Sequence, residues 1–194
     1  LNNFFFREVI EGVENVLGNK GYDLLYFTNK QWEESWVDYS YKEKCKNRNV
    51  DGVLMMGYGK VNIAQFDRLL NSDIPSVFVD LDLVGKNTSY VISDNTGGAK
   101  KAVKYLHNLG HKKIAMIRGL NGFKVSNDRF IGFQQAVNAF DLPYNSSWIY
   151  DGDYSMKTGY EAMKKIMKLE DKPTAVFAED LIAIGAIKAI REDG

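Results

Sequence analysis

Short apolar segments alternate with amphipathic segments along most of the chain, and this alternation constrains the fold more than any other feature. One clear case is the apolar run 113–117, which has the length and composition of a strand. The apolar residues that follow it at helical spacing are Phe130, Phe133, Val137 and Phe140. Such strands between helices are typical of βα units and of a parallel sheet with both faces covered. The pattern predicts an α/β fold with parallel sheets covered by helices on both faces, and it disfavours all-helical and Greek-key folds.

The same spacing rules predict where the individual elements lie. Helices are expected within 5–17, 32–46, 63–70, 99–106, 130–140, 160–167 and 181–191. Strands are expected at 22–27, 53–56, 76–79, 90–92, 113–117, 148–150 and 175–178. The three prolines and the scattered glycines mark turns, and no Pro-rich or Ser-rich linker separates the elements.

Charge and cysteine content exclude several classes of protein. The 194 residues include 25 Lys+Arg and 25 Asp+Glu, so the formal net charge is zero and no broad attraction to nucleic acid or to an acidic membrane is expected. Cys45 is the one cysteine, so no disulfide framework is expected. With only His107 and His111 beside it, a zinc site is not expected either. The chain has no apolar run of about 18 residues, so we expect no transmembrane helix.

Acidic residues and glycines recur where the predicted strands end, which is where open α/β sheets bind ligands. The residues at these ends are Thr28, Gly57, Asp80, Asp94, Gly119, Asp151, Glu179 and Asp180. Such residues suit a polar, uncharged ligand held by hydrogen bonds, although Asp and Gly also serve as helix caps and turns. Their recurrence at several strand ends therefore weighs more than any single residue.

Motifs for enzymatic chemistry are weak. Residues 94–100 follow a strand and open a helix, as a phosphate loop would, but they lack the glycine spacing of one; we expect Gly98 to permit close packing of helix and sheet. Asp80 and Asp82 could offer carboxylates to a metal, with solvation the favoured role. His111 follows a helix C-terminus, where a cation is favourable, and no nucleophile motif accompanies it. We therefore expect neither enzymatic activity nor a cofactor.

An ordered series of motifs spans nearly all of the chain. The most characteristic stretch is 109–115 (LGHKKIA), followed by 126–133 (SNDRFIGF). Further members are 3–6, 11–14, 51–54, 74–80, 94–95, 152–155, 159–163, 174–178 and 183–186. In order and spacing these motifs resemble the effector-binding core of LacI-type transcription regulators, a family with the periplasmic-binding-protein type I fold.

The resemblance implies two lobes joined by a hinge, with a small effector, often a sugar or a purine, bound between them. A chain crossing near Ser93 would make 1–92 the N-terminal lobe and 93–194 the C-terminal lobe. The family has a strand before the first helix and continues past the last one. We therefore expect this chain to be part of a longer polypeptide, lacking the first strand, the end of the second lobe and the helix-turn-helix that reads DNA.

The family's ligand contacts map onto matching positions here. The resemblance implies an apolar wall from Phe5 and Phe6, and hydrogen bonds from ligand hydroxyls to Asp80. It implies that Arg129, in an Arg-x-x-Gly-Phe motif, presents its fork of donors to ring oxygens or a carboxylate. Tyr154 would stack on a sugar or base face. The residues themselves also allow plainer roles: core packing for the two phenylalanines, and a turn position for the tyrosine.

Two further points concern charged residues. Arg129 could instead form a surface ion pair with its neighbour Asp128. Asp180 completes the implied set of ligand-binding residues, in a segment about one residue shorter than the family's. No metal ligands and no catalytic residues are implied.

The leading hypothesis is a cytoplasmic, non-catalytic sensor domain. Effector binding would change the angle between the lobes, and in a homodimer this change would alter the spacing of two DNA-binding heads on operator DNA. The alternative is a solute-binding receptor of an ABC-type sugar transporter, which shares the fold. A helix-turn-helix upstream in the gene would favour the regulator, and a signal peptide or lipobox the receptor. A nucleotide-using enzyme, the third hypothesis, would require turnover on a defined substrate.

Overall fold

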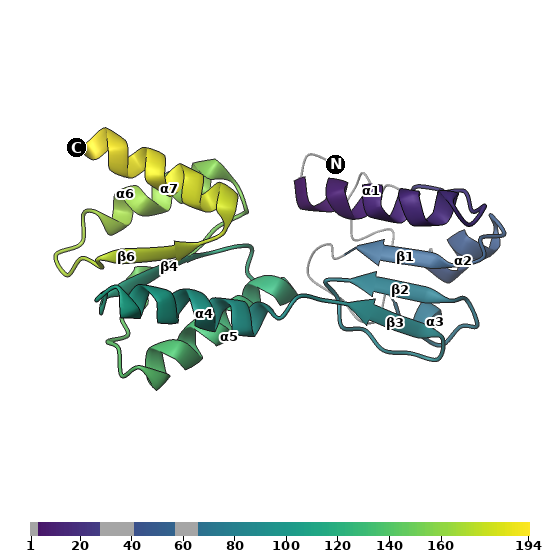
Figure 1. Cartoon of the computed structure of the whole chain (residues 1–194), viewed down its shortest axis with the longest axis horizontal. Helices are drawn as coiled ribbons and strands as arrows, with labels where there is room; N and C mark the ends of the chain where they lie inside the picture. Colours follow the sequence, from purple (N-terminus) through teal and green to yellow (C-terminus); the bar gives the residue numbers. More distant parts are fainter. Residues whose placement is uncertain (1–3, 28–40, 57–65) are drawn as a thin grey trace. The chain divides into compact units, whose positions relative to one another are not determined.

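The computed structural model describes residues 4–27, 41–56 and 66–194 of the chain, which form two compact units (Figure 1). Among these residues, the first unit comprises 4–27, 41–56, 66–78 and 83–89. The second comprises Val79–Asp82 and Tyr90–Gly194. No helix within the described ranges is long and apolar enough to cross a bilayer.

The first unit contains three helices and most of a three-stranded sheet. The helices are α1 (Phe4–Gly18), α2 (Tyr41–Lys46) and α3 (Asp67–Leu70), and the strands are β1 (Val53–Met56), β2 (Ser76–Val79) and β3 (Thr88–Val91). The strand order is β1-β2-β3. The Ser76 amide donates to the Asn87 carbonyl and the Asp80 amide to the Val91 carbonyl, at a constant offset that marks a parallel pair.

One predicted element of this unit is wrong. Residues 22–27 were expected to form a strand, but they have no regular structure, and Tyr22, Leu25, Tyr26 and Phe27 are between 42% and 56% exposed. An apolar run is only compatible with a strand, because a strand also needs a neighbour to satisfy its backbone. Within the described ranges, β1 pairs on one side only, with β2. The expected helices within 32–46 and 63–70, and the candidates Thr28 and Gly57, lie partly or wholly outside the described residues.

The second unit follows the predicted alternation closely. Its elements are α4 (Asn95–Asn108), β4 (Ile114–Arg118), α5 (Lys124–Ala139), η3 (Ser146–Trp148), β5 (Ile149–Asp151), α6 (Met156–Ile166), β6 (Ala175–Ala178) and α7 (Asp180–Asp193). The strand order is β5-β4-β6, and both pairings are parallel, with Met116 opposite Ile149 and Phe177. The prediction of an α/β fold with parallel sheets is confirmed.

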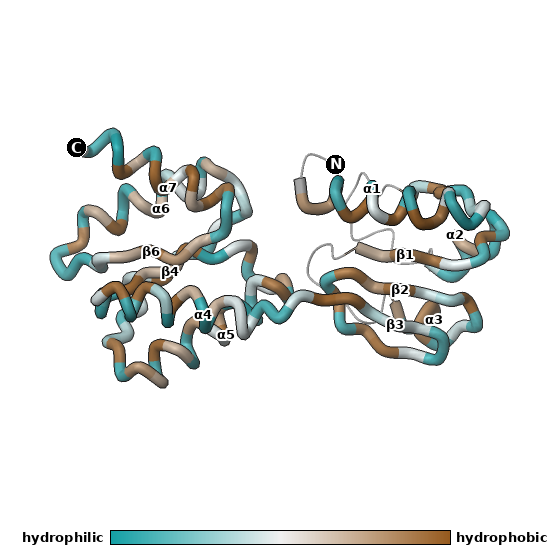
Figure 2. Tube along the Cα trace, viewed as in Figure 1, coloured by the Kyte–Doolittle hydropathy of each residue, from teal (hydrophilic) through white to brown (hydrophobic). Residues whose placement is uncertain are grey.

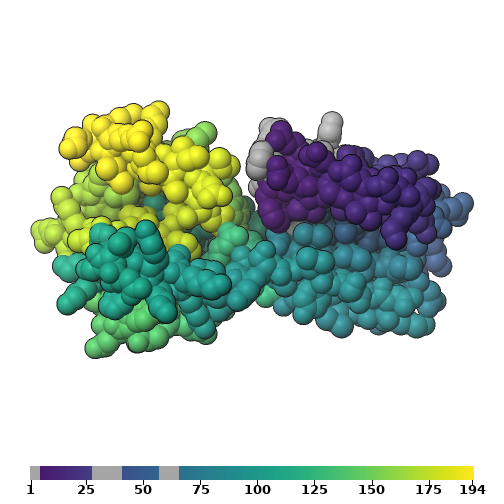
Figure 3. Space-filling view, viewed as in Figure 1, coloured from purple at the N-terminus to yellow at the C-terminus, as the bar shows by residue number. Residues whose placement is uncertain are grey.

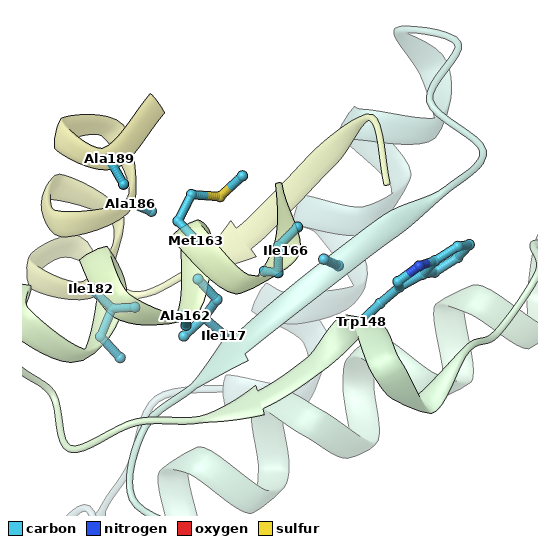
Figure 4. Packing of buried hydrophobic residues seen from close by; sticks show 9 residues of the cluster. Ile117, Trp148, Ala162, Met163, Ile166, Ile182, Ala186 and Ala189 are labelled. Carbon is cyan, nitrogen blue, oxygen red and sulfur yellow. The ribbon is translucent and has the colours of Figure 1, made fainter. Parts of the chain in front are cut away.

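The central strand β4 is buried on both faces. Ile114 and Met116 pack into an apolar cluster with α4 and α5, whereas Ala115 and Ile117 pack into a second cluster with α6 and α7. Figure 4 shows the second cluster, which includes the fully buried Trp148. Successive side chains of a strand point to opposite faces, so a strand covered on both sides has an uninterrupted apolar sequence. That is why 113–117 predicted the layered structure.

Glycines set the close approach of the paired helices. A Cβ on Gly132 of α5 would overlap the Thr96 carbonyl of α4, and one on Gly185 of α7 would overlap the Met156 carbonyl of α6. The expectation for Gly98 is wrong, because a Cβ there would meet nothing within 4 Å. Its neighbour Gly97 is the constrained one, since its amide donates to the Asp94 carboxylate, 2.8 Å away, at the N-cap of α4.

The characteristic stretch 109–115 ends one helix and begins the central strand. Gly110 adopts a left-handed conformation (φ +93°), and the amide of His111 donates to the carbonyl of Leu106, which closes the C-terminus of α4. The His111 Nδ1 atom lies 3.0 Å from Thr174 Oγ1, just before β6. The histidine therefore links the helix end to the neighbouring strand, as its expected non-catalytic role allows.

Candidate functional site

Polar and charged side chains gather at the carboxyl edge of the second sheet. The strands β4, β5 and β6 are parallel, so their carboxyl ends meet at one edge. Arg118 ends β4, Tyr154 follows β5, and Glu179 follows β6. Arg129 of α5 and Asp80, which also belongs to the second unit, complete the group. We call these five residues the strand-edge site.

Arg129 is the most highly connected residue of the strand-edge site. Its Nε atom donates to Asn95 Oδ1 at 2.9 Å, and its Nη1 atom donates to Glu179 Oε1 in a partly buried ion pair. The alternative pairing with Asp128 is not observed, because that carboxylate accepts from Lys124 Nζ at 2.8 Å. The described residues leave the Nη2 donors of Arg129 unengaged, so the guanidinium retains binding capacity.

Both carboxyl groups of the strand-edge site have pKa values above their usual range. Burial raises the pKa of Glu179, and the positive charge of Arg129 only partly opposes this. Burial likewise raises the pKa of Asp80, again against the influence of Arg129. Asp80 also adopts a left-handed backbone conformation (φ +60°) directly after β2, which is costly for a residue with a side chain.

Tyr154 is held in an unusual conformation over a glycine. Its φ is +64°, and its ring lies where a Cβ on Gly119 would have to be. The Phe123 ring meets it edge-on, with centroids 6.0 Å apart. Burial, followed by the charge of Glu179, raises the pKa of the phenol to about 12. The hydroxyl is therefore a neutral donor and acceptor at any physiological pH.

A small cavity reaches from the site towards the core. It measures about 10 Å³, room for roughly one water. Its lining residues are Met116, Ile117, Arg118, Gly119, Ser126, Arg129, Phe177, Ala178 and Glu179. Beside it, the Tyr154 hydroxyl, the Ser126 hydroxyl and Arg118 Nε are buried without a properly directed hydrogen bond to any described residue, although the Ser126 hydroxyl is near enough to lower the pKa of the phenol. Unpaired buried polar atoms are rare and call for a water or ligand partner.

Arg118 differs from Arg129 in having its charge already satisfied. Its side chain is 11% exposed, lies 3.3 Å from an Asp151 carboxylate oxygen and 3.1 Å from Asn127 Oδ1, and stacks 4.1 Å over the Phe130 ring. Sequence reasoning did not single out this residue. Its signal was present, because a charged residue ends an apolar run at the edge where ligands bind.

The structure brings together some of the predicted site residues and not others. Asp80, Arg129 and Tyr154 lie close enough for their charges to act on one another's pKa values. Asp180 is the exposed first residue of α7, and Glu179 beside it makes the ion pair to Arg129. Sequence reasoning named both acids at this strand end but chose Asp180 for the site.

Phe5 and Phe6 lie in the first unit, at the start of α1. Their ring centroids are 5.3 Å apart at an interplanar angle of 71°. Phe5 is 45% exposed, so the alternative of core packing does not describe it.

A layered α/β unit with polar groups at the carboxyl edge of its parallel strands is a ligand-binding domain by construction. Comparison with known proteins gives the family. All of the chain, residues 1–194, matches the family described as periplasmic binding proteins and sugar binding domain of LacI family, and the chain belongs to it.

Individual relatives are regulators. The HTH-type transcriptional repressor PurR of Actinobacillus pleuropneumoniae is 33% identical over 193 residues, which cover 98% of this chain and 56% of that protein. A regulatory protein of the LacI family from Chloroflexus aggregans has a TM-score of 0.79 at 28% identity, covering 94% of this chain and 67% of that one. The transcriptional regulator CelR, solved as a cellobiose complex, has a TM-score of 0.81 at 25% identity, covering 98% and 58%. The chain thus spans about half the length of the curated relatives that it matches.

Proposed function

We propose that this chain is the effector-sensing domain of a LacI-type transcriptional regulator, and that it binds a small, neutral, hydroxyl-rich molecule at the strand-edge site. The observation that carries the proposal is Arg129, held by Asn95 and Glu179 with donors to spare, beside the unpaired hydroxyls of Tyr154 and Ser126. The names of the relatives support a regulator, and the cellobiose complex of CelR supports a sugar-like effector.

The charges of the site favour a neutral ligand over an anion. Glu179 already neutralises Arg129, and Asp80 adds a second carboxyl group nearby. A ligand carboxylate or phosphate would have to compete with Glu179 for the guanidinium and would approach two acidic groups. A sugar hydroxyl can donate to either carboxylate and accept from Arg129 without adding charge.

The regulatory mechanism follows from two lobes, for which we propose the ranges 1–92 and 93–194. In this scheme Phe5 and Phe6 of the first lobe form an apolar wall for a ligand held by the second lobe. The ligand shifts the population of lobe arrangements by its different affinity for each. In a cytoplasmic homodimer, that shift would alter how two helix-turn-helix heads, outside these residues, reach operator DNA.

A ligand screen on the full-length protein tests the proposal. The panel pairs neutral sugars, cellobiose among them, with sugar acids and sugar phosphates, and adds purine bases. We expect a neutral sugar to raise the melting temperature, because it binds only the folded state. Arg129→Ala should weaken binding of that sugar by about 100-fold, since it leaves the Glu179 carboxylate buried and unpaired in the site.

The matched control is Arg68→Ala, which removes an exposed arginine of the first unit that pairs with Glu43. It should leave the ligand-induced shift unchanged. Equal ligand affinity in wild type and Arg129→Ala would remove Arg129 from the site. A sugar acid or phosphate as the tightest ligand would contradict the charge argument.

The solute-receptor alternative is tested separately. The full-length protein is incubated with DNA from upstream of its own gene, and its mobility is measured with and without the ligand found in the screen. Ligand-dependent retention of the DNA supports the regulator. Absence of DNA binding, together with a cleaved signal peptide on the secreted protein, would support the receptor.

A further inference from the structure

Helix α7 carries its bulky aliphatic residues on the wrong side for a helix that only covers a sheet. Its buried residues are Ile182, Gly185, Ala186 and Ala189, which pack on α6 and the sheet. Leu181, Ile184, Ile187 and Ile190 are all between 46% and 52% exposed. Figure 2 shows apolar residues recurring along the whole helix, and Figure 3 shows α7 at the surface of the second unit. Most of the large apolar side chains of α7 therefore point outward.

The other long helices of this unit do not share this pattern. Tyr105 of α4, Ile131 of α5 and Met156 of α6 are the one exposed large apolar side chain of each. Scattered residues of that kind are ordinary on a soluble surface, whereas a continuous apolar patch marks an interaction site. The orientation of α7 is also fixed, because Gly185 lies against the backbone of α6 and cannot turn outward.

We propose that the outer face of α7 is the centre of a homodimer interface, where α7 packs antiparallel against α7 of a second copy. Residues 180, 184, 187 and 191 lie along the middle of this face, with Leu181 and Ile190 at its two sides. A twofold axis midway along the face would place Ile184 against Ile187 of the other copy. The same axis would place Asp180 against Arg191 of the other copy.

Charge complementarity is the argument for a second copy rather than another partner. Asp180 and Arg191 carry opposite charges at equal distances from the proposed axis, and neither forms a salt bridge within the described part of the chain. An isologous contact would therefore make two ion pairs around an aliphatic centre. Ile184, Ile187 and Arg191 also line a shallow hollow that can receive an opposing side chain.

The proposal names the dimer face that the proposed function requires, and it rests on that function, since helix-turn-helix repressors read paired half-sites as dimers. A standard interface removes about 800 Å² from each partner. One helix face is smaller than that, so α7 supplies the apolar centre and neighbouring surfaces supply the rim.

Sedimentation equilibrium of the full-length protein tests the interface. Ile184→Glu should raise the dimer dissociation constant by at least about 100-fold, because two carboxylates would be buried without partners at the twofold axis. Ile131→Glu is the matched control, an equally exposed isoleucine on α5, and should leave the dissociation constant unchanged. Circular dichroism and thermal melts establish that both variants are folded.

The proposed register has its own test. Asp180→Arg and Arg191→Asp should each weaken the dimer by facing like charges across the interface, and the double variant should restore it. A dimer unaffected by Ile184→Glu overturns the proposal, and so does a wild-type protein that remains monomeric at about 100 μM. Loss of folding stability without loss of the dimer would show that another part of the same chain covers the face, and would also overturn it.

These outcomes are separate from those of the ligand screen. A dimer that dissociates in Ile184→Glu supports the interface even if no effector is found. An effector that binds the wild type while the dimer ignores Ile184→Glu supports the sensor function and rejects the interface.

Discussion

The interior of the second unit and the carboxyl edge of its sheet follow opposite rules. In the interior, β4 buries apolar residues on both faces and glycines bring α6 and α7 into direct backbone contact. A few residues away, the strand-edge site contains a left-handed tyrosine, two carboxyl groups with raised pKa values and buried hydroxyls without partners. The interior is arranged for stability, whereas the edge keeps unsatisfied groups that a ligand can satisfy.

This difference shows how to separate structural from functional residues without an alignment. A buried group whose bonding capacity is filled, such as Trp148 with Nε1 donating to the Asp171 carbonyl at 2.9 Å, needs no ligand to explain it. A buried group that destabilises the free protein does need an explanation. Substitutions in the two regions should therefore change stability in opposite directions.

The largest effect is expected in the interior. Gly185→Ala should lower the free energy of unfolding by about 3 kcal/mol, because the new methyl group would overlap the backbone of α6 and force the helices apart. Urea denaturation of the full-length protein measures it. The control is Gly98→Ala on α4, where a Cβ meets nothing within 4 Å, and it should stabilise by about 0.5–1 kcal/mol. Equal losses at the two glycines would contradict the packing argument.

A smaller effect of opposite sign is expected at the edge. Ser126 is almost completely buried with its hydroxyl unpaired, so Ser126→Ala should be neutral or stabilise the protein by up to about 1 kcal/mol. Ser72, equally buried, donates to the Leu69 carbonyl at 2.7 Å, and Ser72→Ala should cost about 1 kcal/mol. The comparison of interior and edge breaks if both alanines destabilise alike. The same urea titrations decide.

The smallest effect is a change in pH dependence. Burial raises the pKa of Glu179 above its ordinary 4.5, so the folded state holds this proton more tightly than the unfolded state does. Stability contributed by the protonated carboxyl is present below pH 4.5 and is lost as the pH rises through the folded-state pKa. The unfolding free energy of wild type relative to Glu179→Gln should therefore decrease as the pH rises through this window.

Glu161→Gln, on the exposed side of α6, serves as the control for removing a surface carboxylate. A wild-type advantage over Glu179→Gln that grows with pH would mean that the ion pair with Arg129 outweighs burial. That result would make Glu179 a stabilising partner of Arg129 in the free protein, and would weaken the contrast between edge and interior.

Sequence reasoning predicted the fold of the second unit almost element by element. Apolar runs of strand length between helices have one common solution, and the run 113–117 is continuously apolar because both faces of β4 are covered. The same reasoning failed at 22–27, where apolar residues do not have a strand beside them. It also misassigned the constrained glycine of α4, because close approach is a property of the neighbouring backbone.

The candidate site was predicted in outline and missed in detail. Strand-end acids and the Arg-x-x-Gly-Phe motif identified Asp80, Arg129 and Tyr154. The partners of Arg129 are Asn95 and Glu179, which lie 34 and 50 residues away along the chain. No local pattern reports such pairings, and Arg118 and Ser126 were missed for the same reason. Asp128, the neighbour in sequence, is held instead by Lys124 one helical turn away.

The sequence by itself determined the layered α/β architecture, the parallel strands and the edge at which polar groups collect. These depend on periodicity and composition, which act within a few residues of each position. Only the tertiary structure decided which carboxylate neutralises Arg129, which hydroxyls stay unpaired and which face of α7 is left uncovered. Those features depend on which atoms distant segments bring together, and on how closely glycines allow their backbones to approach.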